Sequence, residues 1–237
     1  MRVLRVKQGG GAWLKARAGR PTASRMDCIV TPTGKAVSGT KRQSYMHELA
    51  AERLMGRCMD HYSGPAAERG TLLEPQARAW YEVSEGVEVQ RVGLVLPDHA
   101  RWACSPDGLV EPDGGLEIKC PLPRQHVAAL LNDGADYAVQ VQAGIWICER
   151  AWWDLVIYTD IDRLPCTVRR VLPDPALQDA LAEHVPAFCD DLDALVDRLA
   201  EMGAGEAARA AREAESDAEC EALFAAWEAE AAQEDGT

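Results

Sequence analysis

The stretch Ser105–Leu109 (Ser-Pro-Asp-Gly-Leu) is followed, ten residues after Asp107, by Glu117–Lys119 (Glu-Ile-Lys). The first segment has the composition of a turn, and the second has that of a short strand. Residues i and i+2 of a strand face the same side, so Glu117 and Lys119 project together while the isoleucine between them points into the core. If a hairpin brings Asp107 alongside, two hard oxygen ligands and one cation meet. That arrangement suits a site that holds Mg²⁺ and positions water against a phosphodiester.

Hydrophobic patterns on either side of this stretch predict a mixture of strands and helices. Alternating, β-branched patterns predict strands over Val87–Leu96, Arg101–Cys104, Leu116–Cys120, Ala151–Tyr158 and Cys166–Leu172. Helical spacing predicts helices over Ser44–Met55, Thr71–Tyr81, Arg124–Leu131 and Tyr137–Cys148, and an apolar helical stripe from Leu177 to Leu199. The mixture predicts an α/β (α+β) fold, in which a mixed central sheet is flanked by helices and followed by a helical C-terminal extension.

The length of 237 residues predicts one domain with extensions. Residues 1–12, which include three consecutive glycines, are expected to form a flexible N-terminal lead, disordered or weakly extended. Residues 13–203 form the predicted domain, in which Thr22 or Ser24 is expected to cap the start of a helix. Residues 204–237 are rich in Ala and Glu and are predicted to form an acidic helical tail.

The cysteines and the apolar segments indicate a cytoplasmic protein. The eight cysteines are scattered without a Cys-x-x-Cys pair, which suits reduced thiols better than disulfides or a structural zinc site. No apolar run reaches the roughly 18 residues that span a membrane. The first residues lack the apolar stretch of a secretory signal. We therefore expect a soluble protein with no membrane partner.

The net charge of −13 is unevenly distributed. Residues 1–50 hold ten Lys and Arg against two acids, a balance of +8, whereas residues 190–237 have a balance of −12. This asymmetry is compatible with a basic arm that contacts DNA and an acidic tail. The alternative is that both ends are ordinary solvated helical faces.

Longer segments around Asp107 and Lys119 carry a family resemblance. The Asp107…Glu117-x-Lys119 pattern resembles the PD-(D/E)XK nuclease signature. Together, Arg101–Leu109, Gly115–Pro121 and Tyr137–Gln142 closely resemble the lambda exonuclease/YqaJ family of viral recombination nucleases. Upstream, Trp13–Ser24 resembles the amino-terminal phosphate-binding segment of the family, and Gly70–Arg78 resembles its helical acidic motif. The resemblance covers roughly residues 12–200 and implies a PD-(D/E)XK, restriction-endonuclease-like core.

The resemblance implies a metal site built from carboxylates. Asp107 and Glu117 match the metal-binding carboxylates of the family, with the carbonyl of Ile118 as a further ligand. Glu74 resembles the helical acid that completes the metal sphere, and an ordinary exposed helix glutamate is the alternative. The implied cofactor is Mg²⁺, with Mn²⁺ as a substitute.

Two further residues match the catalytic groups of the family. Lys119 resembles the catalytic lysine, whose ammonium orients or deprotonates water or offsets charge on the phosphate. Gln140 matches a glutamine of the family's Gln-x-Gln helix and would hold the nucleophilic water or a backbone phosphate. Gln142 is expected to face away, because residues i and i+2 diverge on a helix.

The basic amino-terminal region is expected to bind DNA. Arg17 resembles the arginine that grips a terminal 5′-phosphate, a task suited to a planar guanidinium. Ser24, near a helix start, would donate to the same anion. Arg25 and Lys35 are further predicted phosphate contacts, for which ordinary surface charge is the alternative. Asp98 is left outside the site.

The predicted function is a Mg²⁺-dependent exonuclease that starts at ends of double-stranded DNA and degrades the 5′-terminated strand. It would leave 3′ overhangs for a single-strand annealing protein in phage-type recombination, encoded by a phage or prophage. The family resemblance makes a homo-oligomer plausible, in particular a trimeric ring. The alternatives are an endonuclease with the same core, an iron–sulfur nuclease, and a catalytically silent DNA-end-binding module. The cysteines near the carboxyl end are too widely separated to favour an iron–sulfur cluster.

Overall fold

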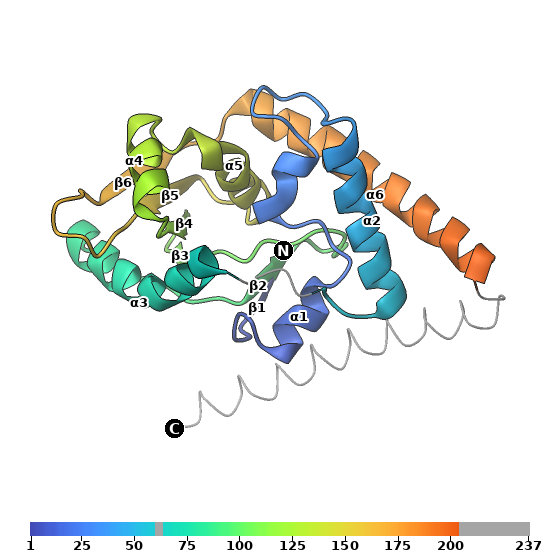
Figure 1. Cartoon of the computed structure of the whole chain (residues 1–237), viewed down its shortest axis with the longest axis horizontal. Coiled ribbons are helices and arrows are strands. Elements are labelled where there is room, and N and C mark those ends of the chain that lie inside the picture. Colours follow the sequence, from blue (N-terminus) through green and yellow to red (C-terminus); the bar gives the residue numbers. More distant parts are fainter. Residues whose placement is uncertain (60–63, 204–237) are drawn as a thin grey trace.

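A computed structural model of the chain describes residues 1–59 and 64–203 (Figure 1). Its main sheet contains four strands in the order β3-β4-β5-β6. These strands are β3 (Gly108–Val110), β4 (Gly114–Lys119), β5 (Trp152–Ile157) and β6 (Thr167–Val171). Strands β4 and β5 are parallel, and the other two pairings are antiparallel. The predicted mixed sheet is therefore confirmed.

A second, two-stranded sheet pairs β1 (Arg2–Leu4) antiparallel with β2 (Leu94–Leu96). The expectation of a flexible lead is wrong at these residues. Leu4 is buried against Leu94, Leu96 and Trp13, so apolar burial accompanies the backbone pairing. The three adjacent glycines led to the prediction of a flexible segment, but they lie after the strand and do not belong to it.

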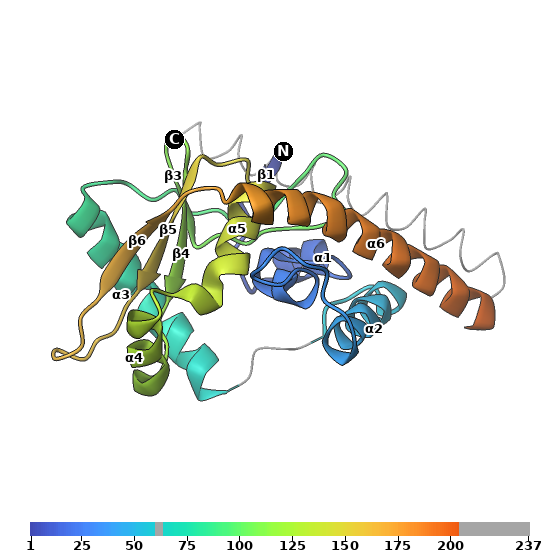
Figure 2. The ribbon, with the colours of Figure 1, turned by 90° about the horizontal axis from the view of Figure 1, so that it is seen from above.

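Helices cover both faces of the main sheet (Figure 2). The elements in chain order are α1 (Gly11–Arg17), the short 3₁₀ helix η1 (Ala23–Cys28), α2 (Thr40–Met55), α3 (Pro65–Glu85), α4 (Pro123–Leu131), the 3₁₀ turn η2 (Ala135–Tyr137), α5 (Ala138–Ile147) and α6 (Pro175–Gly203). The helical C-terminal extension is thus confirmed as far as residue 203. The predicted tail over 204–237 lies outside the described residues.

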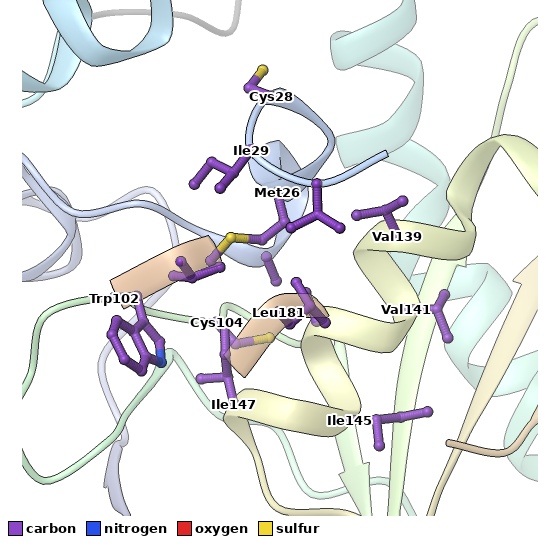
Figure 3. Close-up of a cluster of buried hydrophobic side chains, with 14 of the residues drawn as sticks. Met26, Cys28, Ile29, Trp102, Cys104, Val139, Val141, Ile145, Ile147 and Leu181 are labelled. Atoms are coloured by element: carbon purple, nitrogen blue, oxygen red, sulfur yellow. The ribbon is translucent and has the colours of Figure 1, made fainter. Parts of the chain in front are cut away.

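Side chains of β4 and β5 alternate between two hydrophobic clusters. Leu116 and Ile118 of β4 pack toward α3, where Ala77 and Tyr81 complete one cluster. The opposite face of β5, which includes Trp153, belongs to the larger cluster. Figure 3 shows part of this cluster, where residues of η1, α5 and α6 meet. Because side chains alternate along a strand, Glu117 and Lys119 lie on the face of β4 that α5 covers.

Two predicted strands are shorter than the alternating patterns indicate. In the segment predicted over Val87–Leu96, only Leu94–Leu96 is a strand, and Gln90 forms an isolated bridge to Leu109. The strand predicted over Arg101–Cys104 is absent: Ala103 and Cys104 form isolated bridges, whereas β3 lies where a turn was expected. The amino-terminal segment passes close to the residue before β2, because a Cβ at Gly93 would meet the Val6 carbonyl oxygen at 2.0 Å. This close approach explains part of the shortening of the strand predicted over Val87–Leu96.

Other predicted elements agree with the structure in kind and differ at their ends. The expected helix over Thr71–Tyr81 is the central part of α3, and α2 begins four residues before the predicted Ser44. Thr22 is the residue that precedes η1, as expected for a cap, but its side chain forms no capping hydrogen bond. The division of the chain at residues 12 and 203 stays a prediction. Among the described residues, helices are either too short or too polar to cross a membrane.

Candidate active site

The β3–β4 hairpin brings Asp107 to the middle of β4. The backbone N–H of Ile118 donates to Asp107 Oδ2 at 2.6 Å, and the Asp107 N–H donates to the Leu116 carbonyl at 3.1 Å. Gly115 makes the close packing of this hairpin possible, because a Cβ there would meet the Trp153 ring at 2.1 Å. The hairpin expected from the sequence therefore places the first carboxylate beside the second.

Glu117 is the centre of a polar cluster on the α5 side of β4. Its Oε1 lies 2.7 Å from Lys119 Nζ and accepts a hydrogen bond of 2.6 Å from Gln140 Nε2. The Glu117 side chain is only 8% exposed, so these contacts form where solvent screens them weakly. Gln142 instead binds the Leu172 carbonyl and the Asp174 N–H, which agrees with its expected divergence from the site.

Glu74 lies at the margin of this cluster. It forms an ion pair with Arg78 one helical turn later, and Arg78 Nη2 donates to the Asp107 carbonyl at 3.0 Å. Arg78 thereby links the helical acid to the hairpin. Within residues 1–59 and 64–203, no three His, Cys, Asp or Glu side chains are grouped closely enough to hold a metal ion. The carboxylates that converge directly are Asp107 and Glu117.

Electrostatics favour a cation among these oxygens. Burial raises the pKa of Asp107 well above its ordinary value, and the charges of Glu117 and then Glu74 add to the rise. For Lys119, burial works to lower the pKa, but the contact with Glu117 and the charge of Asp107 outweigh it and the net pKa is raised. Lys119 is therefore an ammonium ion. The two carboxylates and the Ile118 carbonyl are hard oxygen donors, and they fit a divalent cation that would relieve the repulsion.

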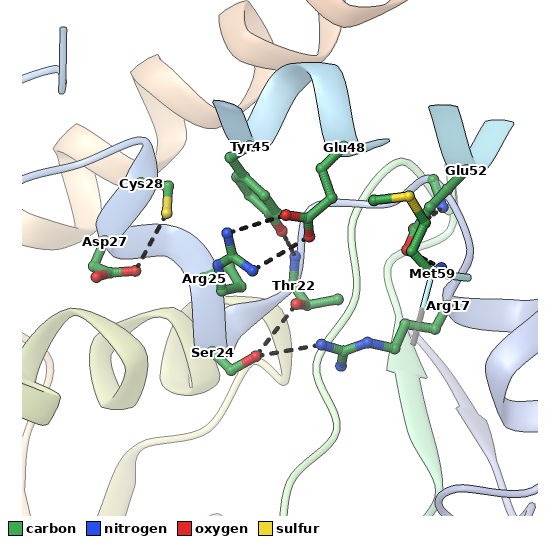
Figure 4. Close-up of polar contacts among 11 residues, drawn as sticks. Arg17, Thr22, Ser24, Arg25, Asp27, Cys28, Tyr45, Glu48, Glu52 and Met59 are labelled. Atoms are coloured by element: carbon green, nitrogen blue, oxygen red, sulfur yellow. Dashed lines mark hydrogen bonds and ion pairs between the residues drawn. The ribbon is translucent and has the colours of Figure 1, made fainter. Parts of the chain in front are cut away.

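A separate cavity of about 450 Å³ lies between α1, η1 and α2 and is lined by Arg17 and Arg25. Arg17 Nη2 lies 3.5 Å from Ser24 Oγ (Figure 4). The Arg25 guanidinium donates to both carboxylate oxygens of Glu48, at 3.2 and 3.4 Å, and stacks 4.5 Å from the centroid of the Tyr45 ring. Three of the four residues predicted to bind a phosphate therefore lie together.

Lys35 does not join this group. It is exposed on the loop between η1 and α2 and is not among the residues that line the cavity. Asp98 is also remote, because its Oδ1 accepts from the amino terminus at 2.8 Å.

Sequence reasoning missed several side chains of these two sites. Arg78 stands four residues after Glu74, a spacing that predicts an ion pair on a helix. Glu48 and Glu52 line the arginine-containing cavity, and no sequence pattern pointed to them. The centroid of the Tyr137 ring lies 5.2 Å from Lys119 Nζ. Tyr137 begins the motif that contains Gln140, but the motif gave no reason to place its ring at the lysine.

Comparisons with known proteins identify the family of the chain. Residues 12–151 match the family model of the YqaJ-like viral recombinase domain. The crystal structure of LHK-Exo, an alkaline exonuclease from Laribacter hongkongensis, is 34% identical with a TM-score of 0.73, and it covers 81% of this chain and 97% of its own. The LHK-Exo complex with dAMP is 36% identical with a TM-score of 0.72 and the same coverage.

A phage-related exonuclease from Haemophilus somnus 129PT shares the fold. Its TM-score is 0.58 at 17% identity, with coverage of 84% of this chain and 97% of its own. No curated protein matches the chain significantly.

The fold and these matches define the chain as a nuclease, a hydrolase that acts on DNA. It belongs to the family of YqaJ-like viral recombinases, as its sequence motifs predicted.

Proposed function

We propose that the protein is a Mg²⁺-dependent 5′-to-3′ exonuclease that acts on ends of linear double-stranded DNA and leaves 3′ single-stranded overhangs. The observation that carries the proposal is the contact of Lys119 and Gln140 with Glu117, at 2.7 and 2.6 Å, beside the buried carboxylate of Asp107. A carboxylate pair with a positioned ammonium suits hydrolysis of a phosphodiester.

In the proposed site, Asp107, Glu117 and the Ile118 carbonyl would hold Mg²⁺, for which Mn²⁺ would substitute, and Glu74 would complete the ligand sphere. When bound, the ion supplies Lewis acidity toward the phosphate and lowers the pKa of water. The Lys119 ammonium lies beside the same carboxylate, where it stabilises charge that develops on the phosphate oxygens. The Gln140 amide orients the attacking water or a backbone phosphate.

The polarity of digestion is assigned to the cavity beside η1. Arg17 and Arg25 offer guanidinium groups for the terminal 5′-phosphate, and Ser24 lies within 3.5 Å of Arg17. Lys35 would contact DNA outside the cavity. LHK-Exo was crystallised in complex with dAMP, a nucleoside monophosphate, and a similar ligand would suit the arginines of this chain.

The wider assignments rest on family membership. We propose that the product overhang passes to a single-strand annealing protein in phage-type recombination and that the enzyme works as a homo-oligomer, with a trimeric ring as the specific form. A phage or prophage gene expressed in the bacterial cytoplasm fits this role.

Digestion of a 5′-phosphorylated linear duplex tests the function. We expect Mg²⁺-dependent loss of the labelled 5′-terminated strand, activity with Mn²⁺, no activity with chelator, and a loss of several orders of magnitude for Lys119→Ala. Closed circular DNA is the control substrate, and its cleavage would favour the endonuclease alternative. A protein that binds ends without degrading them would instead be the silent end-binding module.

A further inference from the structure

The ring of Tyr137 lies against the proposed catalytic lysine. The distance from Lys119 Nζ to the ring centroid is 5.2 Å, which is within the range of a cation–π contact. Tyr137 is half-buried and packs against the larger hydrophobic cluster, so its ring has a fixed surface behind it. The ammonium therefore has two neighbours that hold it, the Glu117 carboxylate and an aromatic face.

The spacing of the two elements matches this double contact. Glu117 and Lys119 are two residues apart on β4, and their side chains are about 6.6 Å apart along the strand. Tyr137 is the last residue of η2 and stands directly before α5, three residues ahead of Gln140, and side chains three residues apart on a helical turn are about 5–6 Å apart. One helical turn thus places an amide on Glu117 and a ring on Lys119 at the same time.

A rigid turn fixes Tyr137 before α5 begins. Its N–H donates to the Gly134 carbonyl at 2.9 Å, and Gly134 has a φ of +68°. The Gly134 N–H donates to Asn132 Oδ1 at 3.0 Å. A Cβ at Gly134 would meet Leu155 Cδ2 at 2.6 Å and Tyr137 Cδ2 at 3.8 Å. The glycine allows the turn to pack against β5, and this packing sets the position of the ring.

We propose that Tyr137 is a positioning residue, whose ring confines the Lys119 ammonium to the direction in which it meets Glu117 and the scissile phosphate. The inference rests on the proposed function, since it assigns Tyr137 a role through Lys119. The ring face carries the effect, and the hydroxyl is not required for it.

Replacement of the ring, followed by steady-state kinetics on 5′-phosphorylated duplex, tests the proposal. Tyr137→Leu lowers kcat about tenfold, because without the ring face the Lys119 ammonium is held less well in the direction in which charge develops on the phosphate. The KM for DNA stays within about twofold, since the ring does not contact substrate. Tyr137→Phe keeps the ring face and recovers most of kcat. Equal losses for Leu and Phe would overturn the role of the ring.

A double-mutant cycle separates positioning from general damage. In the Lys119→Ala background, Tyr137→Leu produces no further loss if the ring acts through the lysine. Tyr158→Leu is the matched control: Tyr158 is a half-buried tyrosine on the other face of the sheet, with its ring 5.9 Å from Trp80. We expect this control to lose stability and keep kcat. A further loss of activity in the Lys119→Ala background would contradict the proposal.

The NMR shift of the Lys119 side chain provides a readout that does not depend on activity. With lysine labelled at Cε, the wild type and Tyr137→Phe should show the ring-current shift of the Lys119 methylene, and Tyr137→Leu should lose it. If wild type is inactive or Lys119→Ala is fully active, the proposed function fails and the role of Tyr137 fails with it. If Lys119 is essential but Tyr137→Leu keeps kcat and the methylene shift, the positioning role alone is wrong.

Discussion

At the scale of single residues, the site concentrates negative charge where solvent is scarce. Asp107 and Glu117 face each other across the hairpin, and Glu74 adds a third charge whose effect reaches Asp107. Lys119 and Arg78 offset part of this charge, but the remaining repulsion in a weakly screened region opposes folding until a further cation is bound. The same arrangement that suits catalysis therefore lowers stability.

Neutralisation of Asp107 should raise stability and abolish activity. In chelator, Asp107→Asn is expected to melt at a higher temperature than wild type, since the amide removes the repulsion at nearly constant volume, while activity is lost. Mg²⁺ at about 100 times its dissociation constant should stabilise wild type by about 2.7 kcal/mol. The variant should not respond. Melting curves with NaCl at equal ionic strength are the control, and a variant that Mg²⁺ stabilises as strongly as wild type would exclude Asp107 as a ligand.

Glu48 is expected to lower the affinity of the arginine-lined cavity for a 5′-phosphate. Its carboxylate accepts hydrogen bonds from Nη1 and Nη2 of Arg25 and would repel an incoming phosphate dianion. Glu48→Gln should therefore tighten binding of 5′-phosphorylated ends about two- to fivefold, the equivalent of 0.5–1 kcal/mol for a partly exposed ion pair. Ends with a 5′-hydroxyl should bind the variant and wild type equally. Weaker binding of phosphorylated ends would show that Glu48 orients Arg25.

At the scale of elements, β4, which carries the proposed catalytic residues Glu117 and Lys119, is approached unusually closely by its neighbours. Gly115 lies under the Trp153 ring of β5, and the strand alternates between the apolar contact with α3 and the polar contact with α5. These contacts explain the composition of β4. The glycines leave room for the tryptophan rings, Leu116 and Ile118 face α3, and Glu117 and Lys119 face α5.

Gly115→Ala should disturb this packing. The added methyl would lie 2.1 Å from the Trp153 ring, so the strand or the indole must shift, and we expect a loss of about 1–3 kcal/mol in the free energy of unfolding. Gly70→Ala is the matched control, because Gly70 lies inside α3 with open space around its Cβ position and should gain about 0.5–1 kcal/mol. Urea unfolding measures both changes, and equal stabilities would show that the hairpin accommodates the methyl.

The accuracy of the sequence interpretation also differs between elements. Strand β4 and helix α5 were predictable, because each has a periodic apolar pattern and because Glu117, Lys119 and Gln140 stand in short motifs that resemble those of the family. Strand β3 was not, since three residues beside the Pro-Asp-Gly turn carry too little periodicity. Tyr137 and Arg78 acquire their roles through contacts between elements, and local patterns do not encode such contacts.

At the scale of the whole molecule, acidic residues of α6 bind arginines from distant segments. Asp193 pairs with Arg53 of α2 and with Arg101, whose Nη2 also lies 2.6 Å from Asp190. Arg42 pairs with Asp191 at 2.6 Å. The sequence showed that basic and acidic residues are concentrated at opposite ends of the chain. The structure shows that some of these charges, such as Arg42 and Asp191, form ion pairs with each other within the fold. Only tertiary contacts reveal this pairing.

Removal of the doubly paired acid should loosen α6. Asp193→Asn breaks contacts with two arginines and is expected to destabilise the fold by about 1 kcal/mol, because networks of ion pairs exceed isolated surface pairs. Asp191→Asn, which affects only the Arg42 pair among the contacts described, should cost less. Urea unfolding at low and high salt provides the measurement, with a difference that shrinks as salt rises. A larger effect at Asp191 would contradict the network.

The parallel pairing of β4 with β5 has a consequence for biosynthesis. Parallel neighbours need a long crossover, and here α4, η2 and α5 fill the interval from residue 120 to residue 151. Asp107 and the Glu117 and Lys119 side chains of β4 can therefore leave the ribosome well before Tyr137, Gln140 and the supporting β5 are synthesised. Since contacts distant in sequence form late, we expect a nascent chain that ends before residue 151 to be unable to cut DNA. The topology would thus delay a potentially harmful activity until the domain is nearly complete.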